Sequence, residues 1–306
     1  MTRISTSPFV RLRVTFFMYT YELKKLPKST VEINLTIPSS DIQKEKADAF
    51  SRLQKELTVE GFRKGKVPLP IAEKHLSQEV VYQELIRVIL PKIYAEILKK
   101  ESLKPIMNPR IELVKAKEGE DWEVKITLAE KPVVELKNYK EVVKEVKTKV
   151  KKADIWVPGK DKSVEEKNPE ANKSKLINPI LEAVLKEVKI EISDLIIDEE
   201  LNHRLSRLVD DVEKIGLTTE AYLKSKNLTM DQLKSNYKRE IEDTYKLEFI
   251  LAEIADCENI KVEKEDLDKL LANIKDEKER KIASENSYYY ASILRKQKTL
   301  DYLLSL

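Results

Sequence analysis

Residues 61–68, with the sequence GFRKGKVP, combine two glycines, one aromatic residue, three cations and a proline. The segment holds two of only five glycines, Gly61 and Gly65, and glycine is favourable chiefly where a tight turn or a close backbone approach requires it. Pro68 follows and prevents a helix from continuing through this point. The segment is therefore predicted to form a shaped loop that faces solvent.

The chemistry of this loop is basic and aromatic. Arg63, Lys64 and Lys66 supply three cations that can pair with phosphates, and the ring of Phe62 can cover an apolar or stacking surface. This combination is typical of a contact with RNA or with a ribonucleoprotein. The alternative is a basic connecting loop without a partner, because short clusters of cations are common.

The residue types that catalysis and metal binding commonly use are scarce in this chain. The chain has two histidines, His75 and His203, which are too few and too far apart in sequence to favour a histidine-based metal site or catalytic triad. The single cysteine, Cys257, rules out an internal disulfide and is predicted to be a buried, inert thiol on a helix. The glycine-containing loop also lacks the GK[ST] ending of a nucleotide-binding loop. We therefore expect no catalytic residue, no metal and no cofactor.

The composition favours extended helices around small cores. The chain has 306 residues, enough for two domains, and it is 41% hydrophobic and 36% charged. Lysine and arginine number 57 against 54 acidic residues, which leaves a formal charge of +3. A contact with nucleic acid must then be local, which fits one basic loop better than a basic face.

The segment before the loop has the pattern of a strand followed by a helix. Residues 31–37 alternate apolar and polar side chains, as in a strand with one buried face, and Pro38 ends this pattern. Ser40 and Gln43 form a capping-box pattern that opens a helix reaching about Leu57. This helix leads the chain directly into the basic loop.

The segment after the loop completes an α+β domain. A second amphipathic helix is predicted over about residues 80–98, with Pro91 kinking it or dividing it in two. Residues 111–114 and 122–128 then predict a pair of strands around a turn at 117–120.

A charged linker is predicted over residues 148–175. Apolar periodicity is lost there, lysines dominate, and two prolines and a glycine interrupt the segment. Within it, Ile155, Trp156 and Val157 are apolar enough to dock on a neighbouring domain, so docking of Trp156 stays an open alternative.

Residues 176–306 predict one all-helical unit. Apolar stripes recur at helical spacing, including a stripe from Leu195 through Val209 to Ile215 that Gly216 ends. Thr229 and Gln232 form a second capping box at the start of a long helix.

Three consecutive tyrosines mark the last predicted helix. Tyr288, Tyr289 and Tyr290 lie about 100° apart around a helix, so they cannot all face one core. We expect at least one to be exposed, where it and Ile293 suit shallow, promiscuous binding of unfolded chains. The alternative is that these rings pack between helices with only their hydroxyls in water.

The octapeptide Gly61 to Pro68 resembles the ribosome-docking signature of bacterial trigger factor, and the resemblance extends over about residues 18–147. Residues 176–306 resemble, more loosely, the helical substrate-holding domain of that family. The resemblance implies an α+β ribosome-binding domain followed by an arm-bearing, all-α chaperone domain with a SurA-like core. Phe62, Arg63 and Lys64 would touch the exit-site ribosomal protein and rRNA of the large subunit.

The same resemblance implies a cytoplasmic, ATP-independent chaperone that holds nascent or unfolded polypeptides, with no membrane partner. A weak homodimer away from the ribosome is left open by the sequence. Trigger factors usually insert an FK506-binding-type prolyl-isomerase domain at the position of the linker. Such a domain needs on the order of 80 to 100 residues, and a linker of about 30 residues cannot hold it. The sequence therefore predicts a form without the isomerase domain and without isomerase activity.

Residues 1–17 do not belong to the predicted first domain. They are basic and resemble a weak targeting segment, but their apolar stretch is far too short to span a membrane. Because the family begins with a strand like residues 19–23, the extra segment also fits a true start at Met18 instead of Met1. A working signal peptide would favour the runner-up function, a ribosome-independent periplasmic chaperone of the SurA kind. A plain RNA-binding protein is the third alternative, although the near-neutral charge supports it poorly.

Overall fold

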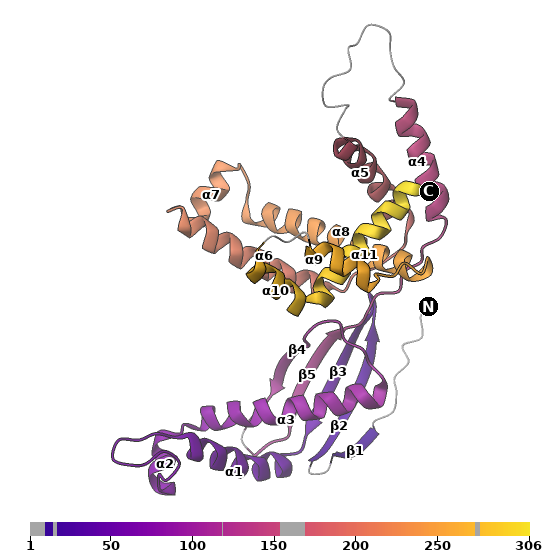
Figure 1. The fold of residues 1–306 in the computed structure, drawn as a ribbon. Coiled ribbons are helices and arrows are strands. Elements are labelled where there is room, and N and C mark those ends of the chain that lie inside the picture. The colour runs from indigo at the N-terminus through magenta and orange to yellow at the C-terminus, as the bar shows by residue number, and fades with distance from the viewer. Residues whose placement is uncertain (1–9, 15–16, 118, 154–168, 273–275) are drawn as a thin grey trace. The chain divides into compact units, whose positions relative to one another are not determined.

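The fold was analysed in a computed structural model that describes residues 10–14, 17–117, 119–153, 169–272 and 276–306. The chain divides into two compact units (Figure 1). The first comprises Met1–Lys131 with Ser193–Ile196, and the second comprises Pro132–Ile192 with Ile197–Leu306. The linker residues 155–157 lie outside the described ranges.

The first unit is built on a five-stranded antiparallel sheet. Its strands, in spatial order, are β1 (Val10–Val14), β2 (Phe17–Leu26), β3 (Thr30–Ile37), β5 (Trp122–Ala129) and β4 (Arg110–Lys115). Alternate residues of β3 are buried, as the period of two predicts. The predicted strand pair is confirmed as β4 and β5, and residues 10–14 of the predicted extra segment pair with β2.

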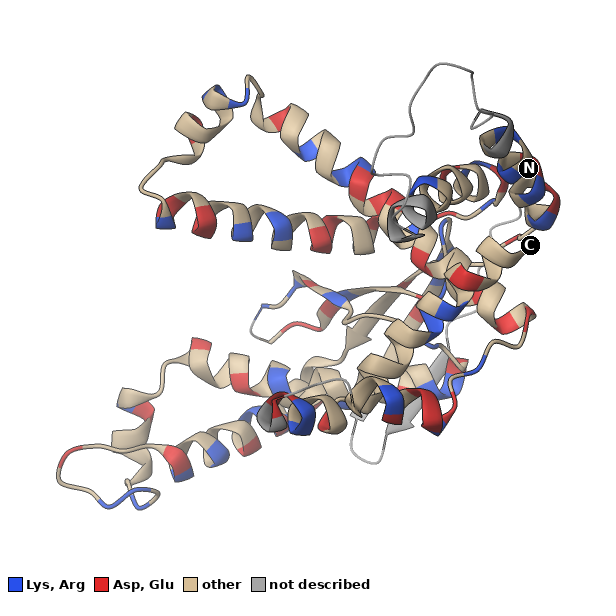
Figure 2. Cartoon of the chain, turned by 45° about the horizontal axis from the view of Figure 1, so that its top comes forward, with Lys and Arg blue, Asp and Glu red and all other residues tan. Residues whose placement is uncertain are grey.

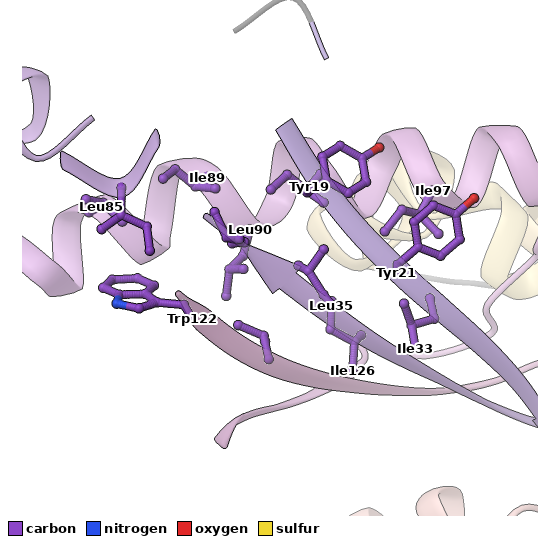
Figure 3. Packing of buried hydrophobic residues seen from close by; sticks show 14 of the residues in the cluster. Tyr19, Tyr21, Ile33, Leu35, Leu85, Ile89, Leu90, Ile97, Trp122 and Ile126 are labelled. Carbon is purple, nitrogen blue, oxygen red and sulfur yellow. The ribbon is translucent and has the colours of Figure 1, made fainter. Parts of the chain in front are cut away.

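One helix covers the sheet and forms the core of this unit. Helix α3 (Gln78–Glu101) places Leu85, Ile89, Ile93 and Ile97 at 0% exposure against the strands. Figure 3 shows Leu85, Ile89 and Ile97 in one cluster with side chains from β2, β3 and β5, including Tyr19, Ile33, Leu35 and Ile126. Each such burial stabilises the fold by roughly 1.5–3 kcal/mol, so this layer fixes where the rest of the unit can attach.

One prediction about helix geometry is wrong, and one of two predicted alternatives is excluded. Helix α1 (Ser39–Glu56) begins directly after Pro38 without a side-chain cap, so Ser40 lies inside the helix and cannot cap it with Gln43. Pro91 does not divide α3, which stays one helix with proline inside it. Burial of Ile89 and Ile93 on either side of Pro91 offsets the lost backbone hydrogen bond.

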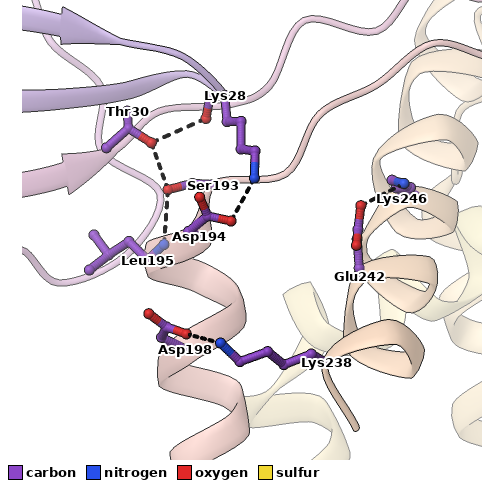
Figure 4. A network of polar contacts seen from close by, with 9 residues as sticks. All are labelled: Lys28, Thr30, Ser193, Asp194, Leu195, Asp198, Lys238, Glu242 and Lys246. Atoms are coloured by element: carbon purple, nitrogen blue, oxygen red, sulfur yellow. Dashed lines mark hydrogen bonds and ion pairs between the residues drawn. The ribbon is translucent and has the colours of Figure 1, made fainter. Parts of the chain in front are cut away.

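The first unit also includes the start of α6 (Asp194–Lys214). Ser193 Oγ lies 2.8 Å from Thr30 Oγ1 and accepts the amide of Leu195 at 3.2 Å, and Lys28 reaches Asp194 at 2.7 Å. Figure 4 shows these contacts at the end of the β2–β3 hairpin. Ser193 therefore satisfies one of the free amides at the helix start.

Helices make up most of the described part of the second unit, as predicted for residues 176–306. Its elements are α4 (Tyr139–Ala153), α5 (Pro169–Glu187), the remainder of α6, α7 (Thr219–Ser225), α8 (Met230–Cys257), α9 (Lys264–Ala272), α10 (Glu277–Glu285) and α11 (Ser287–Ser305). The capping box of Thr229 and Gln232 at the start of α8 is confirmed. Asp198 of α6 and Lys238 of α8 pair at 2.9 Å (Figure 4), and the two helices form an arm with α7 at its tip (Figure 1).

Helix occupies both ends of the predicted linker 148–175. Helix α4 continues to Ala153 and α5 begins at Pro169. Lysine and glutamate are good helix formers even where no apolar stripe exists, which explains why loss of periodicity did not mark the helix ends. The first unit also ends at Lys131, before residue 147, because α4 is bonded within the second unit.

Cys257 is exposed, which corrects the prediction of a buried thiol. It is the last residue of α8, and the core side of that helix there consists of Ile254 and Ala255, at 0% and 1% exposure. Cys257 lies two positions after Ala255, about 200° further around the helix, and therefore points away from that buried residue.

Glu258 joins three helices of the second unit. Its carboxylate accepts hydrogen bonds from Tyr139 at 2.8 Å and Tyr302 at 2.7 Å, and it pairs with Lys140 at 2.7 Å. The hydrogen bond from Lys140, followed by those from Tyr302 and Tyr139, lowers the pKa of Glu258 from 4.5 to about 2. The start of α4, the end of α8 and α11 are thereby held together.

We expect Glu258→Gln to lower the free energy of unfolding by about 1–3 kcal/mol at pH 7, because it removes a charged acceptor shared by three donors. The folded-state pKa lies below the ordinary value, so the stabilisation is present above pH 4.5 and is lost as pH falls towards 2. Urea unfolding at several pH values measures this. The exposed Glu182→Gln serves as control, and equal stability of Glu258→Gln and wild type at pH 7 would contradict the assignment.

Candidate binding loop

The predicted loop connects α1 to α2 (Leu69–His75) and consists of two successive tight turns. The amide of Phe62 donates to the carbonyl of Val59 at 3.1 Å, and the amide of Lys66 donates to that of Arg63 at 2.9 Å. The third residues of these turns are Gly61 and Gly65, with φ of +85° and +75°. A positive φ at this place is typical of a type II turn and favours glycine, as the sequence predicts.

The returning half of the loop lies against the end of α1. The amide of Gly65 donates to the carbonyl of Leu57 at 3.4 Å, and Gln54 Nε2 donates to the carbonyl of Val67 at 2.7 Å. Val67 is only 1% exposed. A Cβ atom at position 65 would lie 2.8 Å from the carbonyl oxygen of Lys55. The loop is therefore folded onto the helix instead of extending freely from it.

The loop presents its predicted contact residues to solvent. Arg63, Lys64 and Lys66 are exposed, and Figure 2 shows the positive charge at the end of the α1–α2 connection. The ring of Phe62 is 39% exposed. The carbonyl end of α1 carries partial negative charge, which favours cations beside it. Within the described part of the chain, none of these three cations pairs with a carboxylate.

Pro68 ends the loop and begins the next helix. Its carbonyl accepts the amides of Ile71 at 3.0 Å and Ala72 at 2.9 Å, which starts α2. The structure thus brings all the predicted loop residues from Gly61 to Pro68 into one connection that is folded onto the end of α1.

The tyrosine cluster lies in the first turn of α11. Tyr288 and Tyr289 are 89% and 62% exposed, which confirms that at least one ring faces solvent. Tyr290 is half-buried and meets Tyr289 edge to face at 5.6 Å. Ile293 is 40% exposed, and Ile282 of α10, which the sequence did not single out, is 58% exposed.

A second exposed apolar surface lies at the far end of α6, and sequence reasoning missed it. Val209, Ile215 and Leu217 are 39%, 67% and 43% exposed, and Val209 and Ile215 belong to the apolar stripe that the sequence predicts. Only Val212 of this turn is buried, at 2%. The stripe runs past the point where α8 can cover it, and Gly216 next to Ile215 is the signal that the helix ends there.

Other kinds of site have little support among the described residues. There, no group of three or more His, Cys, Asp or Glu side chains could hold a metal ion. Within the same ranges, no helix combines the length and the apolar character needed to cross a membrane.

Comparison with known families covers nearly all of the chain. Residues 19–157 match the family profile described as bacterial trigger factor protein, and residues 160–304 match the profile of the trigger factor C-terminus. The chain belongs to the trigger factor family. The α+β unit and the helical unit are thus the N-terminal and C-terminal parts that the resemblance implied.

The individual relatives match only part of this chain. Trigger factor of Streptococcus uberis is 33% identical over 128 residues, which are 42% of this chain and 30% of the relative. Trigger factor of Staphylococcus aureus is 34% identical over 108 residues, 35% of this chain and 25% of the relative. The chain thus matches less than a third of the length of these curated relatives. A solved structure from work on promiscuous substrate recognition by the trigger factor chaperone superposes with a TM-score of 0.61 at 15% identity, covering 93% of this chain and 99% of that one, and shows the shared fold.

This trigger factor chain lacks a domain between its two family regions. The matches end at residue 157 and resume at 160, so only residues 158 and 159 lie between them. The spacing of the two family matches confirms the prediction of a form without the isomerase domain.

The two loop glycines differ in a way that can be tested. We expect Gly65→Ala to open the loop more than Gly61→Ala, because both carry a positive φ but only position 65 meets a backbone oxygen at 2.8 Å. Limited trypsin cleavage after Arg63, Lys64 or Lys66 should be about 5-fold faster in Gly65→Ala than in Gly61→Ala, equivalent to ~1 kcal/mol. Equal cleavage rates in the two variants would mean that contact with α1 does not hold the loop.

Proposed function

We propose that this protein is an ATP-independent chaperone of the bacterial cytoplasm that docks on the large ribosomal subunit and holds emerging polypeptides. The observation that carries the proposal is the basic, aromatic loop from Gly61 to Pro68, folded onto α1 in a chain of the trigger factor family. The loop contacts the exit-site ribosomal protein and the adjacent rRNA.

The chemistry of the loop supports a mixed RNA and protein partner. Arg63 and Lys64 are exposed cations that pair with phosphates, whereas the half-exposed ring of Phe62 buries apolar area against a protein or a base. The formal charge of the whole chain is only +3, so binding depends on this local arrangement and not on a general attraction to RNA.

Two exposed apolar surfaces of the helical unit support polypeptide holding. The tyrosine surface consists of Ile282, Tyr288, Tyr289 and Ile293, and the arm-tip surface consists of Val209, Ile215 and Leu217. Aromatic and aliphatic side chains on a convex helix bind many sequences weakly, since no fitted pocket selects among them. The same surfaces would support a weak homodimer of the free protein.

Tethering explains why weak client contacts are enough. A chaperone held at the tunnel exit meets the emerging chain at an effective concentration of about millimolar. Contacts with dissociation constants in that range are then occupied on the ribosome, and they release the client as its apolar side chains become buried in folding. Hydrolysis of a nucleotide is not needed, and isomerase activity is not part of the proposal because no domain for it lies between the matched regions.

The docking role predicts the effect of removing the loop side chains. The triple variant Phe62→Ala, Arg63→Ala, Lys64→Ala should bind bacterial ribosomes about 100-fold more weakly, because two phosphate contacts and one buried ring are lost. The slope of log affinity against log salt should fall by about 1 to 2. Co-sedimentation with ribosomes over a range of salt concentrations measures both.

A matched control for this experiment is Leu26→Ala, Lys92→Ala, Lys99→Ala, which removes the same number of exposed apolar and cationic side chains from the same unit. It should bind as the wild type does. Equal binding of the loop variant and the control, or no binding by folded wild type, would contradict ribosome docking.

The holding role predicts a separate loss. Tyr288→Ser with Tyr289→Ser, and Ile215→Ser with Leu217→Ser, should each raise the concentration needed to prevent aggregation of an unfolded client by about 3- to 10-fold, since each removes about 1 kcal/mol of apolar contact. Light scattering measures this without ribosomes. Val133→Ser, at a residue that is 77% exposed outside both surfaces, is the control, and an effect as large as that of the paired variants would contradict the assignment.

A further inference from the structure

We infer that Gln54 of α1 is a positioning residue for ribosome docking, whose side-chain amide holds the loop from Gly61 to Pro68 in the conformation that binds. Gln54 lies outside the loop and contacts no partner in this role. The inference rests on the proposed docking function, but its effect on the loop can be measured without ribosomes.

The hydrogen bond made by Gln54 closes the loop. Its Nε2 atom donates to the carbonyl oxygen of Val67 at 2.7 Å, across 13 positions of the chain. The other bond that ties the loop to α1, from the amide of Gly65 to the carbonyl of Leu57, is long at 3.4 Å. The bond of Gln54 is therefore the shorter of these two ties between loop and helix.

The acceptor of this bond needs a donor. Val67 is 1% exposed, and Gln54 is itself half-buried, so the carbonyl lies where water reaches it poorly. A buried carbonyl that loses its donor is unfavourable, and the chain relieves this by moving the carbonyl out to water. Movement of Val67 would pull this buried side chain from its place and release the half of the loop that carries Gly65.

Loss of this tie lowers affinity without removing a contact residue. Phe62, Arg63 and Lys64 keep their side chains, but only the fraction of molecules with the closed loop can dock. The apparent affinity falls by that fraction, whereas the number of phosphates contacted in the docked state does not change. Gln54 thus acts through the shape of the loop, and this separates its effect from that of the loop cations.

The test uses Gln54→Met, which keeps the length of the side chain and loses the donor, in the full-length protein. Gln54→Glu is the second variant, because it keeps the shape and places an acceptor against the carbonyl of Val67. Gln83→Met on α3, at an exposed position of the same unit, is the matched control. Ribosome affinity, its salt dependence, the melting temperature and amide hydrogen exchange of residues 57–68 are measured for each.

We expect Gln54→Met to bind ribosomes about 5- to 10-fold more weakly, with an unchanged salt slope and faster amide exchange confined to residues 57–68. Gln54→Glu should be at least as weak, and Gln83→Met should match the wild type. Client holding without ribosomes should be unchanged in all three. Wild-type affinity and exchange in Gln54→Met would overturn the inference.

Two other outcomes are distinguishable. Faster exchange across the whole sheet and α3, with a lower melting temperature, would show that Gln54 serves general stability, and it would also overturn the positioning role. If the triple loop variant binds ribosomes as the wild type does, the docking proposal fails instead. In that case the exchange of residues 57–68 in Gln54→Met still decides whether this side chain holds the loop.

Discussion

The burial of α3 against the antiparallel sheet is the interaction on which the binding loop depends. Leu85, Ile89, Ile93 and Ile97 are fully buried there, and α1 packs in turn against α3, where Arg52 reaches Glu84 at 3.5 Å. The loop has no core of its own, so its position is inherited from these helices. A rigid scaffold allows a few exposed side chains to be presented in one orientation, and this lowers the entropy lost on docking.

Shape and charge have separate origins in this loop. The shape comes from two turns with glycine at positive φ and from contacts of Gly65 and Val67 with α1. The charge comes from the exposed side chains of Arg63, Lys64 and Lys66. Local backbone geometry and surface chemistry can therefore change independently, which would suit the proposed contact with both protein and RNA.

The sequence predicted what depends on local pattern and missed what depends on distant neighbours. Alternation located β3 and β5, and glycine with proline located the loop, because both signals act within a few residues. Exposure of Ile215 and Cys257 could not be predicted, since a helical stripe does not show where its covering helix ends. The bond from Gln54 to Val67 joins residues on opposite sides of the loop, and no periodicity marks such a pair.

No isomerase domain lies between the matched family regions, so no such domain can bind a client there. In the proposed function the helical unit supplies client contacts, and it exposes apolar side chains at both the arm tip and α11. Each surface alone is small, and small apolar surfaces bind weakly. In the proposed function, weak binding at two surfaces of one tethered molecule would hold a long chain, because the second contact forms at high effective concentration once the first is made. Release would then require no input of energy, since a client that buries its own apolar residues loses both contacts together.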